Sequence, residues 1–143
     1  MADYQIVCTE CGGVNRIPDG KDATHAKCGK CKAALFTGHP ADLGGAQFEK
    51  QVAKNSVPVL VDVWAPWCGP CRSMAPAYEQ AAQQLEPGMR VIKLNSDDNQ
   101  QIAGKMGIRG IPSLILYSGG REVARTSGAM PAGQIVQWAR SHL

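Results

Sequence analysis

Apolar positions follow a strand pattern in several places along the chain. Residues 57–64 are almost continuously apolar and rich in β-branched side chains, which predicts a strand buried on both faces, as in a parallel sheet. Residues 90–94 and 113–117 form two more apolar runs, and residues 121–126 follow a Ser-Gly-Gly turn. That turn predicts a hairpin in which 121–126 is the antiparallel return strand.

Helical spacing of apolar residues occurs in four segments. They cover residues 46–54, 70–85, 99–106 and 131–143. Pro70 fits the first turn of the second helix, whereas Pro76 removes an interior hydrogen bond and predicts a kink. Asp97 or Asp98 is expected to cap the third helix, and Gly107 to close it. The order of elements predicts an α/β fold, with a mixed sheet and helices on both of its faces.

The first part of the chain, residues 1–38, has a different character. It is rich in Gly, Lys and short polar residues, and its few apolar positions cannot form a core alone. A segment this short normally needs a metal or disulfides to fold. Gly and Pro residues between 37 and 45 have the composition of a linker. We therefore expect two domains, a small module at 1–38 and a larger domain at 39–143.

Composition and charge exclude several classes of protein. The chain has 143 residues, with 15 Lys+Arg against 12 Asp+Glu, and a net charge of +3 is too small to indicate a nucleic-acid surface. The longest apolar stretch stops at Asp62, far short of the ~18 to 20 residues that cross a bilayer. The N-terminus lacks the basic and apolar regions of a secretion signal. We expect a cytoplasmic protein without membrane contact, and a monomer.

Six cysteines need an explanation in such a chain, because the cytoplasm keeps thiols reduced. All six stand in Cys-x-x-Cys pairs, four in the first 40 residues and two in the remaining 103. The first two pairs, Cys8/Cys11 and Cys28/Cys31, are separated by sixteen residues, which is the spacing of a zinc ribbon. Two such turns provide the four thiolates that a closed, structural Zn²⁺ site prefers.

We therefore expect one structural zinc ion, held by Cys8, Cys11, Cys28 and Cys31, and no organic cofactor. A pair of disulfides, or free thiols, is the alternative interpretation of the same spacing. Four thiolates around Zn²⁺ leave a formal charge of −2, which basic residues nearby in the sequence offset. These are Arg16, Lys27, Lys30 and Lys32.

The third cysteine pair lies in Trp67-Cys68-Gly69-Pro70-Cys71, directly after the 57–64 strand and at the start of the 70–85 helix. Cys68 at a helix N-terminus meets unpaired N–H groups and the positive end of the helix dipole, which favour its thiolate. Cys68 is therefore the expected nucleophile. Cys71, one turn further into the helix, suits the role of the resolving cysteine. A second zinc site is the alternative, but no other Cys pair is left to complete it.

Three segments of the chain resemble the thioredoxin family. They are 61–71 with Trp-Cys-Gly-Pro-Cys, 93–95 with Lys-Leu-Asn, and 107–113 with Ile-Pro. With the four-cysteine module in front, the whole chain resembles bacterial members of the family that carry an N-terminal zinc ribbon. The resemblance implies a thioredoxin fold preceded by a small ribbon, and thiol-disulfide oxidoreductase activity. Thioredoxin is itself the standard example of a Cys-x-x-Cys motif with a lowered thiol pKa and a reducing potential.

The resemblance also implies roles for residues that pattern alone would leave in the core. Asp62 would be a buried carboxylate of raised pKa that exchanges a proton with Cys71, and Lys93 would be its charge partner on the neighbouring strand. From the residues alone, a strand-end carboxylate in contact with water is the alternative interpretation of Asp62. Pro112 would follow a cis bond beside the dithiol. We interpret Trp64 as a packing residue beneath the site rather than a catalytic one. The implied substrate-docking surface consists of Trp67, Gly69, Pro70, Ile111, Gly128 and Ala129.

The leading hypothesis is a cytosolic protein-disulfide reductase that uses the Cys68/Cys71 dithiol. Its partners would be disulfide-bonded client proteins and, as the resemblance implies, an NADPH-dependent thioredoxin reductase that recharges it. The alternative is a zinc-ribbon adaptor or redox-regulated chaperone in which the dithiol is secondary. Five basic against four acidic residues within 1–40 disfavour nucleic acid as a client of such an adaptor.

Overall fold

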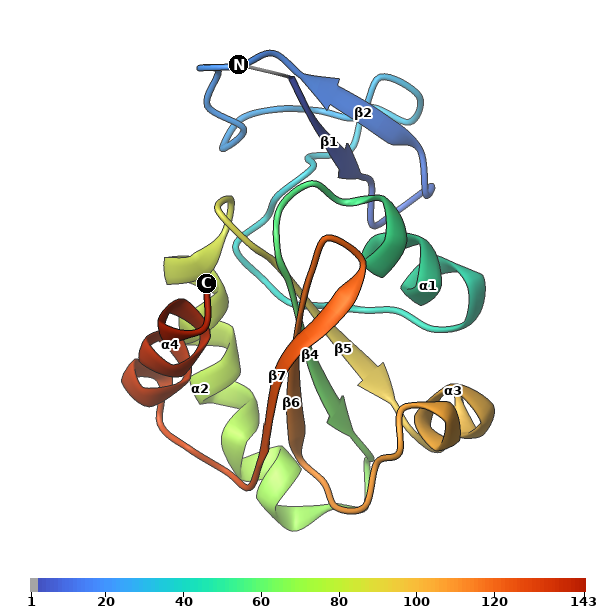
Figure 1. Ribbon diagram of the computed structural model, residues 1–143, viewed down its shortest axis with the longest axis vertical. Coiled ribbons are helices and arrows are strands. Elements are labelled where there is room, and N and C mark those ends of the chain that lie inside the picture. Colours follow the sequence, from blue (N-terminus) through green and yellow to red (C-terminus); the bar gives the residue numbers. More distant parts are fainter. Residues whose placement is uncertain (1–2) are drawn as a thin grey trace.

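The computed structural model describes residues 3–143, which form two separate sheets (Figure 1). In the N-terminal sheet, β1 (Tyr4–Val7) pairs antiparallel with β2 (Val14–Ile17). The second sheet has the strand order β3-β5-β4-β6-β7. Its strands are β3 (Ala41–Asp42), β4 (Val59–Trp64), β5 (Arg90–Asn95), β6 (Ser113–Ser118) and β7 (Arg121–Ser127). The helices are α1 (Gly45–Lys54), α2 (Gly69–Leu85), α3 (Gln100–Lys105) and α4 (Ala132–Ser141).

The larger sheet is mixed, as the order of elements predicts. The central strand β4 runs parallel to β5 and antiparallel to β6, and β5 runs parallel to β3. The β6–β7 pair is the expected hairpin. Helices α2 and α4 cover one face and α1 and α3 the other, so the predicted α/β architecture with helices on both faces is confirmed (Figure 1).

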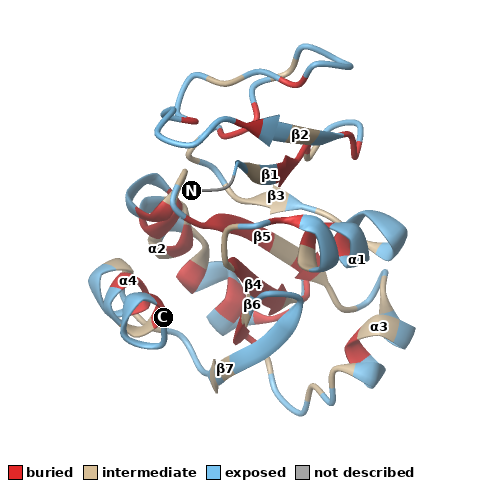
Figure 2. Cartoon of the chain, turned by 45° about the horizontal axis from the view of Figure 1, so that its top comes forward, coloured by how far each residue is buried: buried red, intermediate tan, exposed pale blue. Residues whose placement is uncertain are grey.

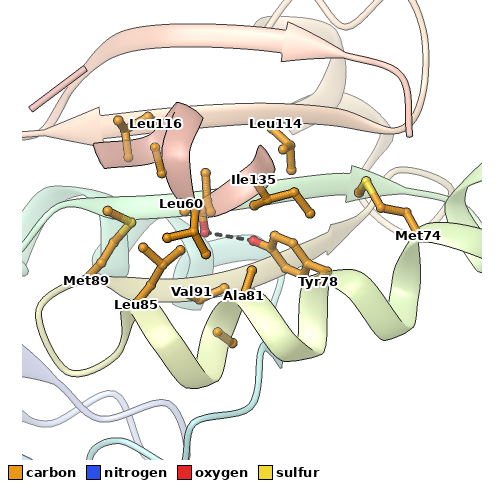
Figure 3. Packing of buried hydrophobic residues seen from close by; sticks show 13 residues of the cluster. Leu60, Met74, Tyr78, Ala81, Leu85, Met89, Val91, Leu114, Leu116 and Ile135 are labelled. Atoms are coloured by element: carbon orange, nitrogen blue, oxygen red, sulfur yellow. Dashed lines mark hydrogen bonds between the residues drawn. The ribbon is translucent and has the colours of Figure 1, made fainter. Parts of the chain in front are cut away.

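The core divides between these two faces because side chains alternate along a strand. Leu60 of β4 belongs to the cluster under α2 and α4, whereas Val59, Val61 and Val63 belong to the cluster under α1 and α3. Buried residues accordingly concentrate along the central strands and on the helix faces that meet them (Figure 2). In Figure 3, Tyr78 reaches from α2 into the first cluster, where its hydroxyl donates to the Leu60 carbonyl at 3.2 Å.

Two local expectations differ from the structure. The strand predicted from residue 57 begins at Val59. The predicted caps Asp97 and Asp98 are wrong, because the N-cap of α3 is Asn99 and makes no side-chain capping bond. The side chain of Asn95 instead accepts from the N–H groups of both aspartates, which forms a turn before the helix begins.

The predicted linker contains a short edge strand, β3, which pairs in parallel with β5. The small N-terminal sheet lies against one end of the larger sheet, and α2 begins at the opposite end (Figure 1). The four-cysteine module and the start of α2, which carries the third cysteine pair, therefore lie at opposite ends of the molecule.

Within residues 3–143, every helix is too short or too polar to span a lipid bilayer.

Candidate functional site

The dithiol motif occupies the junction between β4 and α2. Cys68 and Cys71 form a disulfide with Cα atoms 5.2 Å apart. Cys68 is the N-cap of α2, and its Sγ accepts a hydrogen bond from the Cys71 N–H at 3.2 Å. A sulfur in this position faces the unpaired N–H groups and positive dipole of the helix, which stabilise a thiolate once the disulfide is reduced.

Both sulfur-bearing residues are nearly buried, at 4% exposure for Cys68 and 3% for Cys71. The difference in depth between them is therefore small in the disulfide form. They pack against Ala65, with Trp64 and Ile111 at the margin of the same cluster. Trp64 thus lies beside the dithiol as a packing residue, as the sequence suggests.

The loop before β6 closes the other side of the dithiol. The Ile111–Pro112 peptide bond is cis. The Ile111 carbonyl oxygen lies 3.8 Å from the Sγ of Cys68, and the Pro112 carbonyl accepts from the Gly128 N–H at 2.9 Å. Segments more than forty residues apart in sequence therefore meet at the sulfur.

The residues expected to form a docking surface are mostly exposed. Trp67 is 68% exposed, Ile111 is half-buried, and the rest are exposed. These exposed positions are Gly69, Pro70, Gly128 and Ala129. The expected docking surface thus consists of small or apolar groups with few side-chain donors, to which a peptide strand could approach closely.

Asp97 binds Trp67 of the expected docking surface, although the sequence suggested only a helix cap for it. Its carboxylate accepts from the indole N–H of Trp67 at 2.9 Å and 3.2 Å. The bond spans 30 residues and fixes the orientation of an otherwise exposed indole ring. One signal could have found it: Asp97 follows the carboxyl end of β5, next to the end of β4, where functional groups of such sheets gather.

Asp62 lies inside the molecule, on the face of β4 that α2 covers. It is 1% exposed, and neither carboxylate oxygen has a hydrogen-bond partner among residues 3–143. Burial raises the pKa of Asp62 to about 7, Lys93 opposes the rise and Asp42 adds to it. The alternative of a solvated strand-end carboxylate is therefore wrong. The group can hold or release a proton near neutral pH.

Lys93 faces Asp62 across the β4–β5 pair, where the two residues are register partners. Its ammonium group lies 4.4 Å from the centroid of the Trp64 ring, in a cation–π contact. Among the described residues, the two side chains make no ion pair within 4.0 Å. Lys93 therefore acts on Asp62 through space, and Trp64 holds the cation beside the site.

The other four cysteines gather at one point of the N-terminal module. Their Sγ atoms all lie within 4.8 Å of one another, with 3.6 Å separating Cys8 from Cys31 and also Cys11 from Cys28. Sulfurs held ~2.3 Å from a tetrahedral Zn²⁺ would lie about 3.8 Å apart, so this cluster fits the ion. The distances exceed the ~2.05 Å of a sulfur–sulfur bond, and the four cysteines are free.

Backbone groups around the cluster also suit a thiolate set. The N–H groups of Glu10, Gly13 and Lys30 donate to the sulfurs of Cys8, Cys11 and Cys28 at 3.3 to 3.4 Å. Each Cys-x-x-Cys turn thus aims its donors at the sulfurs, as a closed metal site requires.

Family comparisons match both parts of the chain. Residues 40–141 match the family model described as thioredoxin, and residues 7–33 match the model described as thioredoxin 2, N-terminal. Residues 34–39 separate the two matches. The chain is similar in sequence and in fold to proteins with the same description.

Among curated proteins, the chain is 39% identical to thioredoxin C-3 of Corynebacterium nephridii, over 96% of this chain and 94% of that protein. It is 45% identical to thioredoxin 1 of a Nostoc species, over 72% of this chain and 96% of that protein. Among solved structures, a mutant thioredoxin from Halobacterium salinarum superimposes with a TM-score of 0.67 and 29% identity, covering 75% of this chain and 93% of that one. The first of these alignments extends through the four-cysteine module.

Proposed function

The chain belongs to the thioredoxin family and is a protein-disulfide reductase, and from this premise we propose that Cys68 attacks the client disulfide and Cys71 resolves the intermediate. The observation that carries this assignment is the position of Cys68 Sγ, which caps α2 and accepts from the Cys71 N–H. Only the sulfur at the cap receives this stabilisation as a thiolate.

The reaction then proceeds in two exchanges. The Cys68 thiolate attacks one sulfur of the client disulfide, which forms a mixed disulfide and releases the other client sulfur as a thiolate. The Cys71 thiolate next attacks the Cys68 sulfur, which restores the Cys68–Cys71 disulfide and releases the second client thiolate. Two electrons pass from the dithiol to the client, and the released thiolates take up protons from solvent.

We propose Asp62 as the group that accepts the proton of Cys71 before the second exchange. Its pKa of about 7 lies near the working pH, which is the condition for efficient proton transfer. Its side chain is on the α2 face of β4, and α2 carries Cys71. Lys93 tunes this carboxylate by its charge, while its contact with Trp64 holds it in place.

The docking of clients is assigned to the surface around Cys68. An extended client strand would pair with the backbone beside Pro112, while Trp67 and the small groups at Gly69, Pro70, Ile111, Gly128 and Ala129 contact its side chains. Such backbone recognition tolerates many sequences. We therefore propose disulfide-bonded proteins as a class of clients, with an NADPH-dependent thioredoxin reductase as the source of electrons.

We further propose one structural Zn²⁺ on Cys8, Cys11, Cys28 and Cys31, in a ribbon formed by residues 1–38 ahead of a thioredoxin domain at 39–143. The ion would supply four-way cross-linking of a module too small to fold on its core alone. The four free cysteines of the ribbon fit a cytoplasmic location, where thiols are kept reduced.

Reduction of insulin disulfides by NADPH and thioredoxin reductase tests the proposal against the adaptor alternative. The full chain should support continuous NADPH oxidation, and Cys68→Ser should abolish it. An adaptor or chaperone with a secondary dithiol would instead suppress aggregation of unfolded protein equally well in both forms, with little reductase turnover in either.

A further inference from the structure

Val7, the residue directly before the first ribbon cysteine, is held at both of its backbone groups by buried side chains of the thioredoxin domain. Its N–H donates to Asn55 at 2.8 Å, and its carbonyl accepts from Arg90 at 2.8 Å and from Gln51 at 3.2 Å. We propose that Arg90, Gln51 and Asn55 are positioning residues of the four-cysteine metal site. The inference rests on the proposed zinc site and extends it into the second domain.

Arg90 ties together both halves of the ribbon. One guanidinium nitrogen donates to Val7, which leads into the first Cys-x-x-Cys turn. Another donates to the Leu35 carbonyl at 2.8 Å, and the guanidinium carbon lies 4.3 Å from the centroid of the Phe36 ring. Leu35 and Phe36 follow the second Cys-x-x-Cys turn. A single side chain thus sets the distance between the segments that carry the two pairs of sulfurs.

The setting of Arg90 makes these contacts strong. Its side chain is 2% exposed, as is the side chain of Glu86, whose carboxylate lies 3.6 Å away. Breaking a buried pair of this kind leaves an uncompensated charge, and a charged donor to a carbonyl contributes more than a neutral one.

Gln51 and Asn55 form the second part of this support, on the last turn of α1 and just after it. The Gln51 amide also donates to the Cys8 carbonyl at 3.4 Å, and Cys8 itself is a proposed ligand. Gln51 is 0% exposed and Asn55 is 5% exposed. The Asn55 amide donates to the Gln51 carbonyl at 2.9 Å and to its side-chain oxygen at 2.5 Å, so each residue orients the other.

Two consequences follow from this arrangement. Side chains of the thioredoxin domain contribute to metal affinity, because they hold the ligand-bearing backbone in its bound geometry. By linkage, metal binding must also stabilise the contacts between the ribbon and the thioredoxin domain. An ion that binds only the folded ribbon shifts the unfolding equilibrium of the domain that is coupled to the ribbon. The ribbon and the domain then unfold as one unit, although the zinc site and dithiol lie at opposite poles.

The rate of zinc transfer to a chromogenic chelator tests the inference in the full chain. Arg90→Met retains a long unbranched side chain but removes the hydrogen bonds to both carbonyls. We expect the release of zinc from this variant to accelerate roughly tenfold or more. Gln51→Leu removes the amide contacts without leaving a buried charge and should accelerate release severalfold. Arg90→Lys should release zinc more slowly than Arg90→Met, because lysine keeps the charge and one donor.

Tyr78→Phe is the matched control. It removes buried hydrogen bonds to the Leu60 and Ile92 carbonyls in the same domain, away from the ribbon. This variant should lower the free energy of unfolding while leaving the release rate of zinc unchanged. The Co²⁺-substituted protein adds a spectroscopic measure, because a displaced ligand alters the thiolate-to-metal absorption in Arg90→Met and Gln51→Leu but not in Tyr78→Phe.

Release at the Tyr78→Phe rate from both Arg90→Met and Gln51→Leu would overturn the inference. If Arg90→Met does not fold, Arg90→Lys and Gln51→Leu decide the question by the same comparison. Metal analysis of the unaltered chain separates the two claims. Absence of bound zinc there contradicts the proposed zinc site, whereas one zinc per chain with unchanged release in the variants contradicts only the positioning role.

Discussion

Asp62 and Lys93 are register partners on β4 and β5, yet the Lys93 ammonium group lies over the Trp64 ring, 4.4 Å from its centroid. The carboxylate is left without a hydrogen-bond partner among residues 3–143, and burial raises its pKa to about 7. A cation close by but not bonded leaves the carboxyl able to change its protonation state near neutral pH. That property is what a proton acceptor for Cys71 needs.

Replacing Asp62 by Ala should therefore change stability in a pH-dependent way. The carboxyl ionises near its ordinary value of 3.8 in the unfolded chain but only near 7 in the folded protein. As pH rises from 4 to 7, the free energy of unfolding of the unaltered protein falls relative to that of the variant. The fall amounts to roughly 4 kcal/mol and does not grow further above pH 7. Denaturant titrations of the oxidised proteins at pH 4 and pH 8 measure this change and cancel the effect of the cavity.

Asp62→Ala should also slow disulfide reduction, by roughly ten- to hundredfold near neutral pH, because Cys71 loses its proton acceptor. Asp98→Ala removes an exposed carboxylate after the neighbouring strand and serves as the control, with no effect on either measurement. Two results together would show that Asp62 is an ordinary structural residue. They are a stability difference between variant and wild type that is the same at both pH values, and full turnover in the variant.

The Trp67–Asp97 hydrogen bond makes a separate prediction about client docking. Asp97→Ala frees the indole ring of Trp67. Each client that binds must then restrict the rotation of this side chain, which lowers affinity. We expect KM for a protein disulfide to rise roughly three- to fivefold, with little change in kcat or in the free energy of unfolding. Polarised tryptophan fluorescence should report the freed ring. An unchanged KM would mean that Trp67 is positioned without its partner.

The ribbon should respond to oxidants through its two outer cysteines. Cys11 and Cys31 are exposed, whereas Cys8 and Cys28 are buried. The purified reduced protein should contain one zinc per chain, and peroxide should release it, because an oxidised sulfur no longer ligates as a thiolate. Differential alkylation followed by mass spectrometry should find Cys11 and Cys31 modified first. Equal modification of all four cysteines before zinc is lost would contradict this order.

Much of this architecture is readable from local sequence patterns. The apolar run in β4 and the helical spacing of α2 are strong because burial constrains each position in them. The two cysteine constellations are readable as well, since each depends on residues a few positions apart. The structure confirms the mixed sheet, the helices on both faces and the convergence of the four ribbon sulfurs.

Other features depend on contacts that no local pattern contains. Arg90 opens an apolar strand, where a charged residue ordinarily faces water, yet it donates to a carbonyl 83 residues away. Asp97 resembles a helix cap but binds Trp67 across 30 residues. The two-residue strand β3 is too short for any periodicity to reveal. In each case the structural role depends on a partner distant in the sequence, and the local pattern around the residue does not reveal that partner.

Trapping of mixed disulfides tests most directly that Cys68 attacks and Cys71 resolves. Cys71→Ser should accumulate client proteins bound through Cys68, because the second exchange is blocked, and these complexes should dissociate on addition of dithiothreitol. Cys68→Ser should trap none, since Cys71 is not at the helix cap. Non-reducing electrophoresis and mass spectrometry of both variants supply the measurement. Equal trapping by the two variants, or trapping only by Cys68→Ser, would contradict the assignment.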